Sequence, residues 1–225
     1  MSLGVTMELT DLHTAAEQNA AARSRLYQLL AAAFGFPDDD LFAAVCDGSF
    51  AAALAQTCAA LPYDLGAALA AGLHDTGGAY ADFESEYIRL FDVGPAGPPC
   101  PLYGGVYAGD RMKTMEDATR FYNFFQLRLV PQVRELPDHI TTELEFLHYL
   151  TFREVEARQR GMDPSPLLRA TRDFLARHLS KWVPRMQARL AKQTTCAFFP
   201  ALVQFAVTFF AADHAYAAAA AEALQ

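Results

Sequence analysis

The stretch Pro137-Asp-His-Ile-Thr-Thr-Glu-Leu-Glu-Phe-Leu-His148 begins a helix-forming run that continues to Arg160. Asp138 stands just before this run, where a carboxylate can accept hydrogen bonds from the first N–H groups of a helix. Gly161 stands just after it, where a residue of left-handed conformation commonly ends a helix. The stretch therefore predicts a helix over residues 138–160, with Asp138 as its N-cap.

Most of the remaining chain repeats this helical pattern, and no window alternates apolar and polar residues as a strand does. We find no internal repeat. The sequence therefore predicts an all-α fold, a single compact multi-helix domain over residues 1–225, with residues 1–9 as a flexible end that derives in part from cloning. Further helices are expected over residues 10–34, 41–60 with a break at Gly48, 61–73, 80–91, 110–129, from Pro166 onward with a kink or break at 182–184, and 198–223.

Composition limits the classes of function. The chain has 225 residues, of which 52% are hydrophobic and 12% aromatic, so it can bury a sizeable core. Its net charge of -8 argues against nucleic acid as a partner and favours a basic one. The four cysteines are dispersed without a C-x-x-C pair, and the N-terminus shows no secretion signal. These features predict a reduced, cytoplasmic protein.

The most apolar segment covers residues 198–212 and ends at Asp213-His214. It contains Pro200 and Gln204 and is short for a bilayer span, so a buried core helix is predicted and stable membrane insertion is not.

A second unusual stretch reads Glu86-Tyr-Ile-Arg-Leu-Phe-Asp-Val-Gly-Pro-Ala-Gly-Pro-Pro-Cys-Pro-Leu-Tyr-Gly-Gly-Val-Tyr107. Residues 94–105 contain four prolines and four glycines and cannot form a regular helix. The aromatic residues that flank them have two interpretations. They either fill a gap in the core beside a rigid connector, or they form a stiff apolar wall with acidic neighbours. Such a wall would suit a peptide that carries apolar residues and arginines.

Candidate chemistry is sparse. His139, Glu143, Glu145 and His148 have the spacing of metal ligands, but on one helix the last two point about 120–180° away from the first two. The chain also lacks the second Glu-x-x-His that a di-iron bundle requires. Cys100 has no identifiable base, and no phosphate-binding glycine motif is present. We therefore predict no catalytic residue, no metal ligand and no cofactor.

Both stretches resemble the signature of a known family. Glu86-Tyr-x-x-Leu-Phe-x-Val-Gly-Pro, Pro-x-Pro-Leu-Tyr-Gly-x-Val-Tyr107 and Pro137-Asp-His-Ile-x-x-Glu-Leu-Glu-Phe-Leu are similar to motifs of the TorD/DmsD/NarJ family, in the same order. These are cytoplasmic chaperones that mature molybdenum-cofactor redox enzymes. Tyr103 stands where some members have tryptophan, and Gly105 replaces a serine. The proline-rich segment is similar to the branch that serves ethylbenzene-, dimethylsulfide- or selenate-type enzymes.

The resemblance implies a non-enzymatic chaperone. Its partner would be an apo-molybdoenzyme catalytic subunit, whose N-terminal twin-arginine signal region it would hold for cofactor insertion and proofreading before export or assembly. It implies no nucleic-acid partner, and a monomer or a domain-swapped dimer with a hinge near residues 130–137. Two alternatives stay open from the residues themselves, namely a metal-dependent helical oxidoreductase and a generic helical adaptor that binds proteins.

The predicted peptide-binding residues come from both stretches. By resemblance, Asp138 and His139 match the Asp-His pair that the family uses for client binding. Each Leu-sized side chain that becomes buried contributes about 1.5–3 kcal/mol, whereas an exposed ion pair contributes about 0–1 kcal/mol. Apolar contacts should therefore set affinity and carboxylates should select for arginine. The predicted set is Glu86, Tyr87, Leu90, Phe91, Pro101, Leu102, Tyr103, Tyr107, Asp138, His139 and Glu143.

Overall fold

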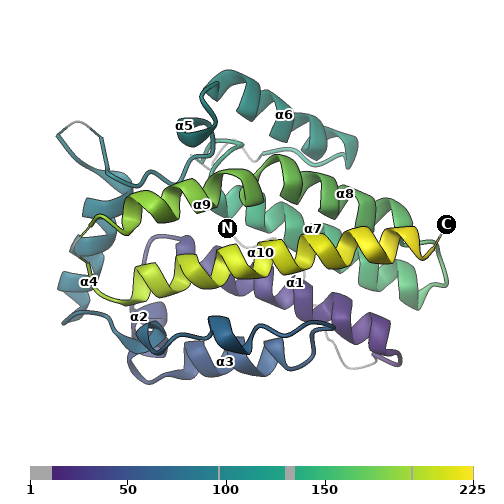
Figure 1. Ribbon diagram of the computed structural model, residues 1–225, viewed down its shortest axis with the longest axis horizontal. Coiled ribbons are helices and arrows are strands. Elements are labelled where there is room, and N and C mark those ends of the chain that lie inside the picture. The colour runs from purple at the N-terminus through teal and green to yellow at the C-terminus, as the bar shows by residue number, and fades with distance from the viewer. Residues whose placement is uncertain (1–11, 96, 130–134, 194, 225) are drawn as a thin grey trace.

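The computed structural model describes residues 12–95, 97–129, 135–193 and 195–224, which form a bundle of helices (Figure 1). The described residues contain no strand, in agreement with the predicted all-α class. Two 3₁₀ turns and one π-helical turn, labelled η, accompany the α-helices. The elements are α1 (Ala15–Phe34), α2 (Asp39–Cys46), α3 (Ser49–Cys58), η1 (Gly66–Ala68), η2 (Ala71–His74), α4 (Tyr80–Tyr87), η3 (Ile88–Asp92), α5 (Gly105–Ala108), α6 (Arg111–Phe124), α7 (Ile140–Gln159), α8 (Ser165–Arg177), α9 (Leu179–Leu190) and α10 (Phe198–Glu222).

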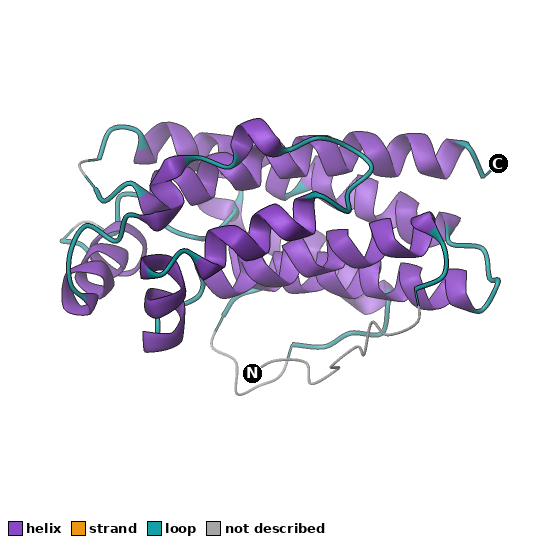
Figure 2. Cartoon of the chain, turned by 90° about the horizontal axis from the view of Figure 1, so that it is seen from below, coloured by secondary structure: helices purple, strands orange, loops and turns teal. Residues whose placement is uncertain are grey.

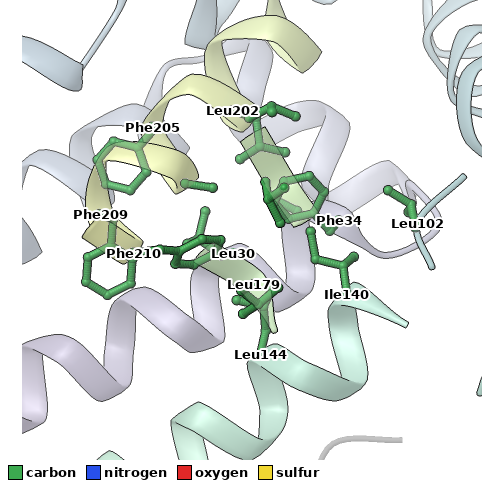
Figure 3. Close-up of a cluster of buried hydrophobic side chains, with 14 of the residues drawn as sticks. Leu30, Phe34, Leu102, Ile140, Leu144, Leu179, Leu202, Phe205, Phe209 and Phe210 are labelled. Atoms are coloured by element: carbon green, nitrogen blue, oxygen red, sulfur yellow. The ribbon is translucent and has the colours of Figure 1, made fainter. Parts of the chain in front are cut away.

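The long helices lie side by side (Figure 2). α1 packs along α7, while α10 packs against α8 and α9 and crosses the front of the molecule in Figure 1. Their facing sides bury one large core, part of which is shown in Figure 3. Its labelled members include Leu30 and Phe34 from α1, Leu144 from α7, and Phe205 and Phe209 from α10.

Helix α10 agrees with the helix predicted over residues 198–223, and its 25 residues are long and apolar enough to cross a membrane by length and composition alone. More than half of its most apolar window, 56%, is buried inside the bundle, as in a core helix. Asp213 lies fully buried in α10 and pairs with Arg23 of α1 at 2.5 Å. Arg23 also pairs with Glu154 of α7 at 2.6 Å, so this charge cluster ties three helices together.

Several helix boundaries follow the predictions. Gly48 adopts φ of 80° between α2 and α3, and Gly161 adopts φ of 64° after α7, as a residue without Cβ readily does. Pro166 lies in the first turn of α8. The predicted hinge falls largely on residues 130–134, which lie outside the described residues.

Two helix predictions are wrong. Residues 61–73 contain only the turns η1 and η2, because glycines interrupt them and η2 packs closely on the start of α10. A Cβ on Gly72 would lie 2.9 Å from the Ala197 carbonyl oxygen. The predicted break at 182–184 is also absent, since α9 continues through Pro184 while Trp182, Val183 and Met186 anchor its buried face. The chain bends instead at His178, between α8 and α9.

Candidate functional site

The two unusual stretches meet in the structure. The Gly104 N–H donates to the Asp138 carbonyl at 2.8 Å, and the Ile140 N–H donates to the Leu102 carbonyl at 2.9 Å. Tyr103 and His139 thereby form a short antiparallel bridge. Residues that are far apart in sequence therefore build one local unit beside the start of α7.

Asp138 holds this unit together from inside. Its side chain is fully buried, and its Oδ2 accepts a hydrogen bond from the Gly105 N–H at 2.8 Å, at the start of α5. The N-cap of α7 is His139, whose Nδ1 accepts from the Thr141 N–H at 3.4 Å. The prediction that Asp138 caps α7 is therefore wrong, because its carboxylate serves the other stretch. Gly105 is needed here, since a Cβ would lie 2.9 Å from Asp138 Oδ2.

A hollow of about 170 Å³ lies beside this junction. Both stretches line it, together with the loop between α1 and α2. Five predicted residues take part, namely Tyr87, Phe91, Leu102, Tyr103 and His139. The other lining residues are Gly35, Phe36, Asp92, Glu135 and Thr141.

Aromatic rings form most of the wall of the hollow. Phe36 and Tyr87 meet edge to face with ring centroids 5.6 Å apart, and Tyr87 meets Phe91 in the same way at 5.2 Å. The Tyr87 hydroxyl donates to the Phe34 carbonyl at 2.9 Å, which satisfies its polar end. Phe36 remains 56% exposed. The hollow therefore combines aromatic rings with polar groups, in a shape that is fixed by packing before any ligand arrives.

The π-helical turn η3 sets the position of Phe91. The Val93 N–H donates to the Ile88 carbonyl at 2.9 Å, five residues earlier, which widens the end of the helix begun by α4. The Leu90 carbonyl accepts from the Cys100 N–H at 2.9 Å, so the proline-rich loop is bound to this turn. As a result, Leu90 enters the core while Phe91 lines the hollow.

Acidic groups give the hollow its electrostatic character. Glu135 Oε2 accepts from the Tyr103 hydroxyl at 3.0 Å and lies 3.6 Å from His139 Nε2. Burial, followed by the Glu135 carboxylate, raises the pKa of Tyr103 to about 12. Burial lowers the pKa of His139 against the opposing effect of Glu135, so this imidazole is neutral at pH 7. With Asp92 exposed on the lining, the hollow attracts cations.

The other predicted site residues lie elsewhere. Glu143 is fully buried and accepts from Trp182 Nε1 at 2.9 Å, and burial raises its pKa. Tyr107 stacks on the same tryptophan with ring centroids 5.5 Å apart. Its hydroxyl donates to the carbonyl of the half-buried Pro101 at 3.0 Å. Glu86 pairs with Arg89 at 2.7 Å outside the hollow. Glu86, Tyr107 and Glu143 therefore do not line the hollow.

The described residues are not arranged as a metal site or as an activated nucleophile. Glu143 and His148 turn to different partners, since His148 Nδ1 lies 2.8 Å from Ser24 Oγ. No group of three or more histidine, cysteine, aspartate or glutamate side chains is placed to hold a metal ion in the part of the chain that the structure describes. Burial raises the pKa of the Cys100 thiol, which is opposite to the shift that activates a nucleophilic cysteine.

The predicted set omits five lining residues, of which Phe36 supplies an aromatic ring and Glu135 a carboxylate that pairs with Tyr103 and His139. Phe36 lies nearly sixty residues before the proline-rich loop, and the loop after α1 brings it to Tyr87. Its position in Gly35-Phe36-Pro37, an aromatic residue between two helix breakers, was the available signal. Glu135 lies in the segment predicted as a hinge, and no sequence pattern separates it from other surface glutamates.

Comparison with known proteins assigns the chain to a family. The profile described as nitrate reductase delta subunit matches residues 48–188, which include both unusual stretches and most of the hollow. The chain belongs to this family. Three similar members are assembly chaperone proteins for perchlorate reductase of Dechloromonas aromatica, selenate reductase of Thauera selenatis and dimethyl sulfide dehydrogenase of Rhodovulum sulfidophilum.

The similarity to these nitrate reductase delta subunit relatives extends over most of the domain. The Dechloromonas protein is 34% identical over 84% of this chain and 86% of its own length. The Thauera protein is 40% identical over 53% of this chain and 63% of its own length. The Rhodovulum protein is 33% identical over 80% of this chain and 74% of its own length. The predicted TorD/DmsD/NarJ resemblance, including its dimethylsulfide and selenate branch, is confirmed. These relatives are named for assembly and not for catalysis, which supports the predicted non-enzymatic role.

Proposed function

We propose that this protein is a cytoplasmic assembly chaperone that binds the N-terminal, twin-arginine signal region of an apo-molybdoenzyme catalytic subunit. The observation that carries the proposal is the hollow built jointly by the two family motifs, with an aromatic wall and two carboxylates. Bound there, the signal would be withheld from export until the cofactor is inserted. The chaperone itself needs no cofactor, metal or nucleic acid for this role.

The size of the hollow fits a polypeptide better than a small molecule. Small-molecule sites usually enclose about 300–1,000 Å³, whereas this hollow measures about 170 Å³. It therefore suits one or two side chains of an extended or helical segment that continues over the surrounding surface. Phe36 and Val93, which are 56% and 62% exposed, extend the apolar surface on which that segment would lie.

The charges explain why a signal region with arginines would be preferred. Glu135 and Asp92 face the same hollow as the aromatic rings, so a guanidinium group can lie over a ring while it pairs with a carboxylate. Burial of apolar side chains, at about 1.5–3 kcal/mol each, would supply most of the affinity. The carboxylates would supply discrimination and orientation.

Calorimetric titration tests this proposal. The ligand is a synthetic peptide with two adjacent arginines followed by an apolar run, and the matched variants are Phe36→Ser and Phe124→Ser. Both side chains are largely exposed, at 56% and 80%, but only Phe36 lines the hollow. We expect Phe36→Ser to weaken binding about tenfold, which corresponds to about 1.4 kcal/mol, and Phe124→Ser to leave it unchanged.

Equal affinities of both variants and the unchanged protein would show that the peptide binds elsewhere. An arginine-free peptide that binds as tightly as the native one would remove the role of Glu135 and Asp92. A monomer or a domain-swapped dimer remains our prediction for the oligomeric state, because most of the predicted hinge, residues 130–134, lies outside the described residues.

A further inference from the structure

Charge is strongly segregated along this chain. Residues 38–92 contain ten acidic side chains and one basic side chain, whereas residues 174–212 contain no acidic side chain. This second segment contains Arg177, Lys181, Arg185, Arg189 and Lys192, in a protein whose net charge is -8. A basic segment of this kind creates a local potential opposite to that of the whole molecule.

The structure gathers these charges along one face of α9 and just past its end. Lys181, Arg185 and Arg189 lie in α9 at intervals of four residues, and Lys192 follows two residues after the helix ends at Leu190. At about 100° per residue, the first three lie within about 80° of the helix circumference, and the stretch from Lys181 to Lys192 corresponds to about 16 Å of helical rise. All four are exposed, while Trp182 and the other apolar residues of α9 form its buried face. We call these four side chains the basic face of α9; the helix itself packs against α5 (Figure 1).

Two of the four cations are held in place by Tyr107. The Arg185 guanidinium donates to the Tyr107 carbonyl at 2.6 Å, and Arg189 lies over the Tyr107 ring at 4.5 Å from its centroid. Tyr107 is itself fixed by stacking on Trp182. Two long side chains therefore lose part of their freedom before any partner binds, which lowers the entropic cost of an ion pair.

No carboxylate in the described part of the chain neutralises this face. None of the four cations lies within ion-pair distance of an acidic side chain among the described residues. By contrast, Arg177 at the end of α8 pairs with Asp117 of α6. Lys181 also borders a cavity of about 860 Å³ between α6 and the α8–α9 bend, whose lining is of mixed charge, with Lys113, Arg120 and Arg177 beside Asp110, Glu116 and Asp117.

We propose that the basic face of α9 is a docking surface for an acidic polypeptide segment. Four cations along about 16 Å correspond to about five residues of an extended strand, which rises about 3.3 Å per residue. Nucleic acid fits less well, because the acidic residues of positions 38–92 and the net charge of -8 repel a long polyanion. A membrane fits less well too, because α9 has no exposed large apolar side chain to insert.

This surface is separate from the hollow and has the opposite preference. The hollow carries Asp92 and Glu135 and attracts basic segments, whereas the basic face of α9 attracts acidic ones. Tyr107 lies under the basic face and does not line the hollow. The chaperone can therefore hold two chemically different segments at the same time, either from one client or from a client and a second protein.

Fluorescence anisotropy with the full-length protein tests the proposal. The probe is a labelled decaglutamate peptide, with a decaglutamine peptide as the uncharged control. The charge reversals Lys181→Glu and Lys192→Glu are combined in one variant. These two side chains are chosen because, unlike Arg185 and Arg189, they do not contact Tyr107. The matched control combines Arg25→Glu on α1 with Arg160→Glu just after the end of α7; both side chains are exposed, and the change in net charge is the same.

We expect salt-sensitive binding of decaglutamate, at least tenfold weaker in the α9 variant and unchanged in the control. If both variants lose decaglutamate binding equally, the loss is due to the change in net charge and not to the basic face, and the proposal is wrong. It is also wrong if a DNA oligonucleotide or phosphatidylserine vesicles bind through the same residues more tightly than decaglutamate does. Should the double reversal prevent folding, Lys181→Gln with Lys192→Gln replaces it, with at least a threefold loss expected.

The twin-arginine peptide serves as a second readout on the same variants. The α9 variant should bind it with unchanged affinity, because its contacts lie in the hollow. Loss of decaglutamate binding with retention of the twin-arginine peptide would support two separate surfaces. Loss of both in a folded variant would contradict the separation.

Discussion

The substitution Asp138→Ala distinguishes a structural role from direct client contact. Asp138 belongs to the family motif, yet its side chain is fully buried and its carboxylate binds the Gly105 N–H at 2.8 Å. On this geometry the carboxylate fastens the proline-rich stretch to the start of α7. Its removal should therefore destabilise the protein and only secondarily weaken peptide binding.

The magnitude follows from the contacts of the carboxylate. A hydrogen bond to a charged group contributes about 1.5–3 kcal/mol, and its loss leaves a buried N–H unpaired. The second oxygen, Oδ1, is buried and has no hydrogen-bond partner among the described residues, so removing it relieves part of an existing desolvation cost. We therefore expect a net loss of about 1–2 kcal/mol in the free energy of unfolding. For a protein of this size that lowers the melting temperature by about 2–8 °C.

Urea denaturation measures this loss as a lower midpoint with an unchanged slope. The control is Asp110→Ala, which removes an exposed cap of α6 that accepts from the Lys113 N–H at 3.0 Å. That change should cost about 1 kcal/mol and leave peptide affinity unaltered. Asp138→Asn should be milder than Asp138→Ala, because the amide oxygen can still accept from Gly105. Full stability of Asp138→Ala together with loss of peptide binding would refute the structural role and restore direct contact.

Two further predictions concern the bundle. Arg23→Met should lower the free energy of unfolding by about 3–5 kcal/mol, because it leaves the buried Asp213 and Glu154 carboxylates without their shared cation. A loss below about 1 kcal/mol, measured by thermal melting, would contradict this prediction. Stability should also fall as the pH drops below about 6.5, because burial lowers the pKa values of His139 and His148, so that the unfolded chain binds more protons there. Denaturation midpoints from pH 7 to pH 5 measure this slope, and the double variant His139→Gln with His148→Gln should flatten it. An unaltered slope in that variant would assign the effect to other groups.

The sequence predicted what depends on local spacing. Apolar residues at helical intervals identified the bundle, and Gly48, Gly161 and Pro166 identified helix ends, because each acts through the backbone of its own neighbourhood. Pro184 was misinterpreted because a proline is normally costly inside a helix. Here Trp182 and its neighbours anchor the buried face of α9, so packing outweighs the single lost hydrogen bond.

The site was harder to predict because it depends on contacts between distant segments. Asp138 precedes a helix and was therefore predicted to cap it. In the structure its carboxylate accepts from the Gly105 N–H at the start of α5, which lies far away in sequence, and not from the first turn of α7. Phe36 and Glu135 carry no motif, so only the fold reveals that they complete the hollow. Tyr87, Phe91, Leu102, Tyr103 and His139 could be predicted because the family resemblance had already selected both stretches.

The burial of the motif residues explains how one fold can serve different clients. Leu90, Asp138 and Glu143 are fully buried and fix the π-helical turn, the α5 turn and α9 relative to one another. Substitutions there change the frame of the hollow and are costly in stability. Exposed lining residues such as Phe36 and Asp92 contribute little to folding, so they are free to vary with the client's sequence. The motif therefore encodes the frame of the binding surface, and we expect client specificity to reside in the exposed residues between and around these buried positions.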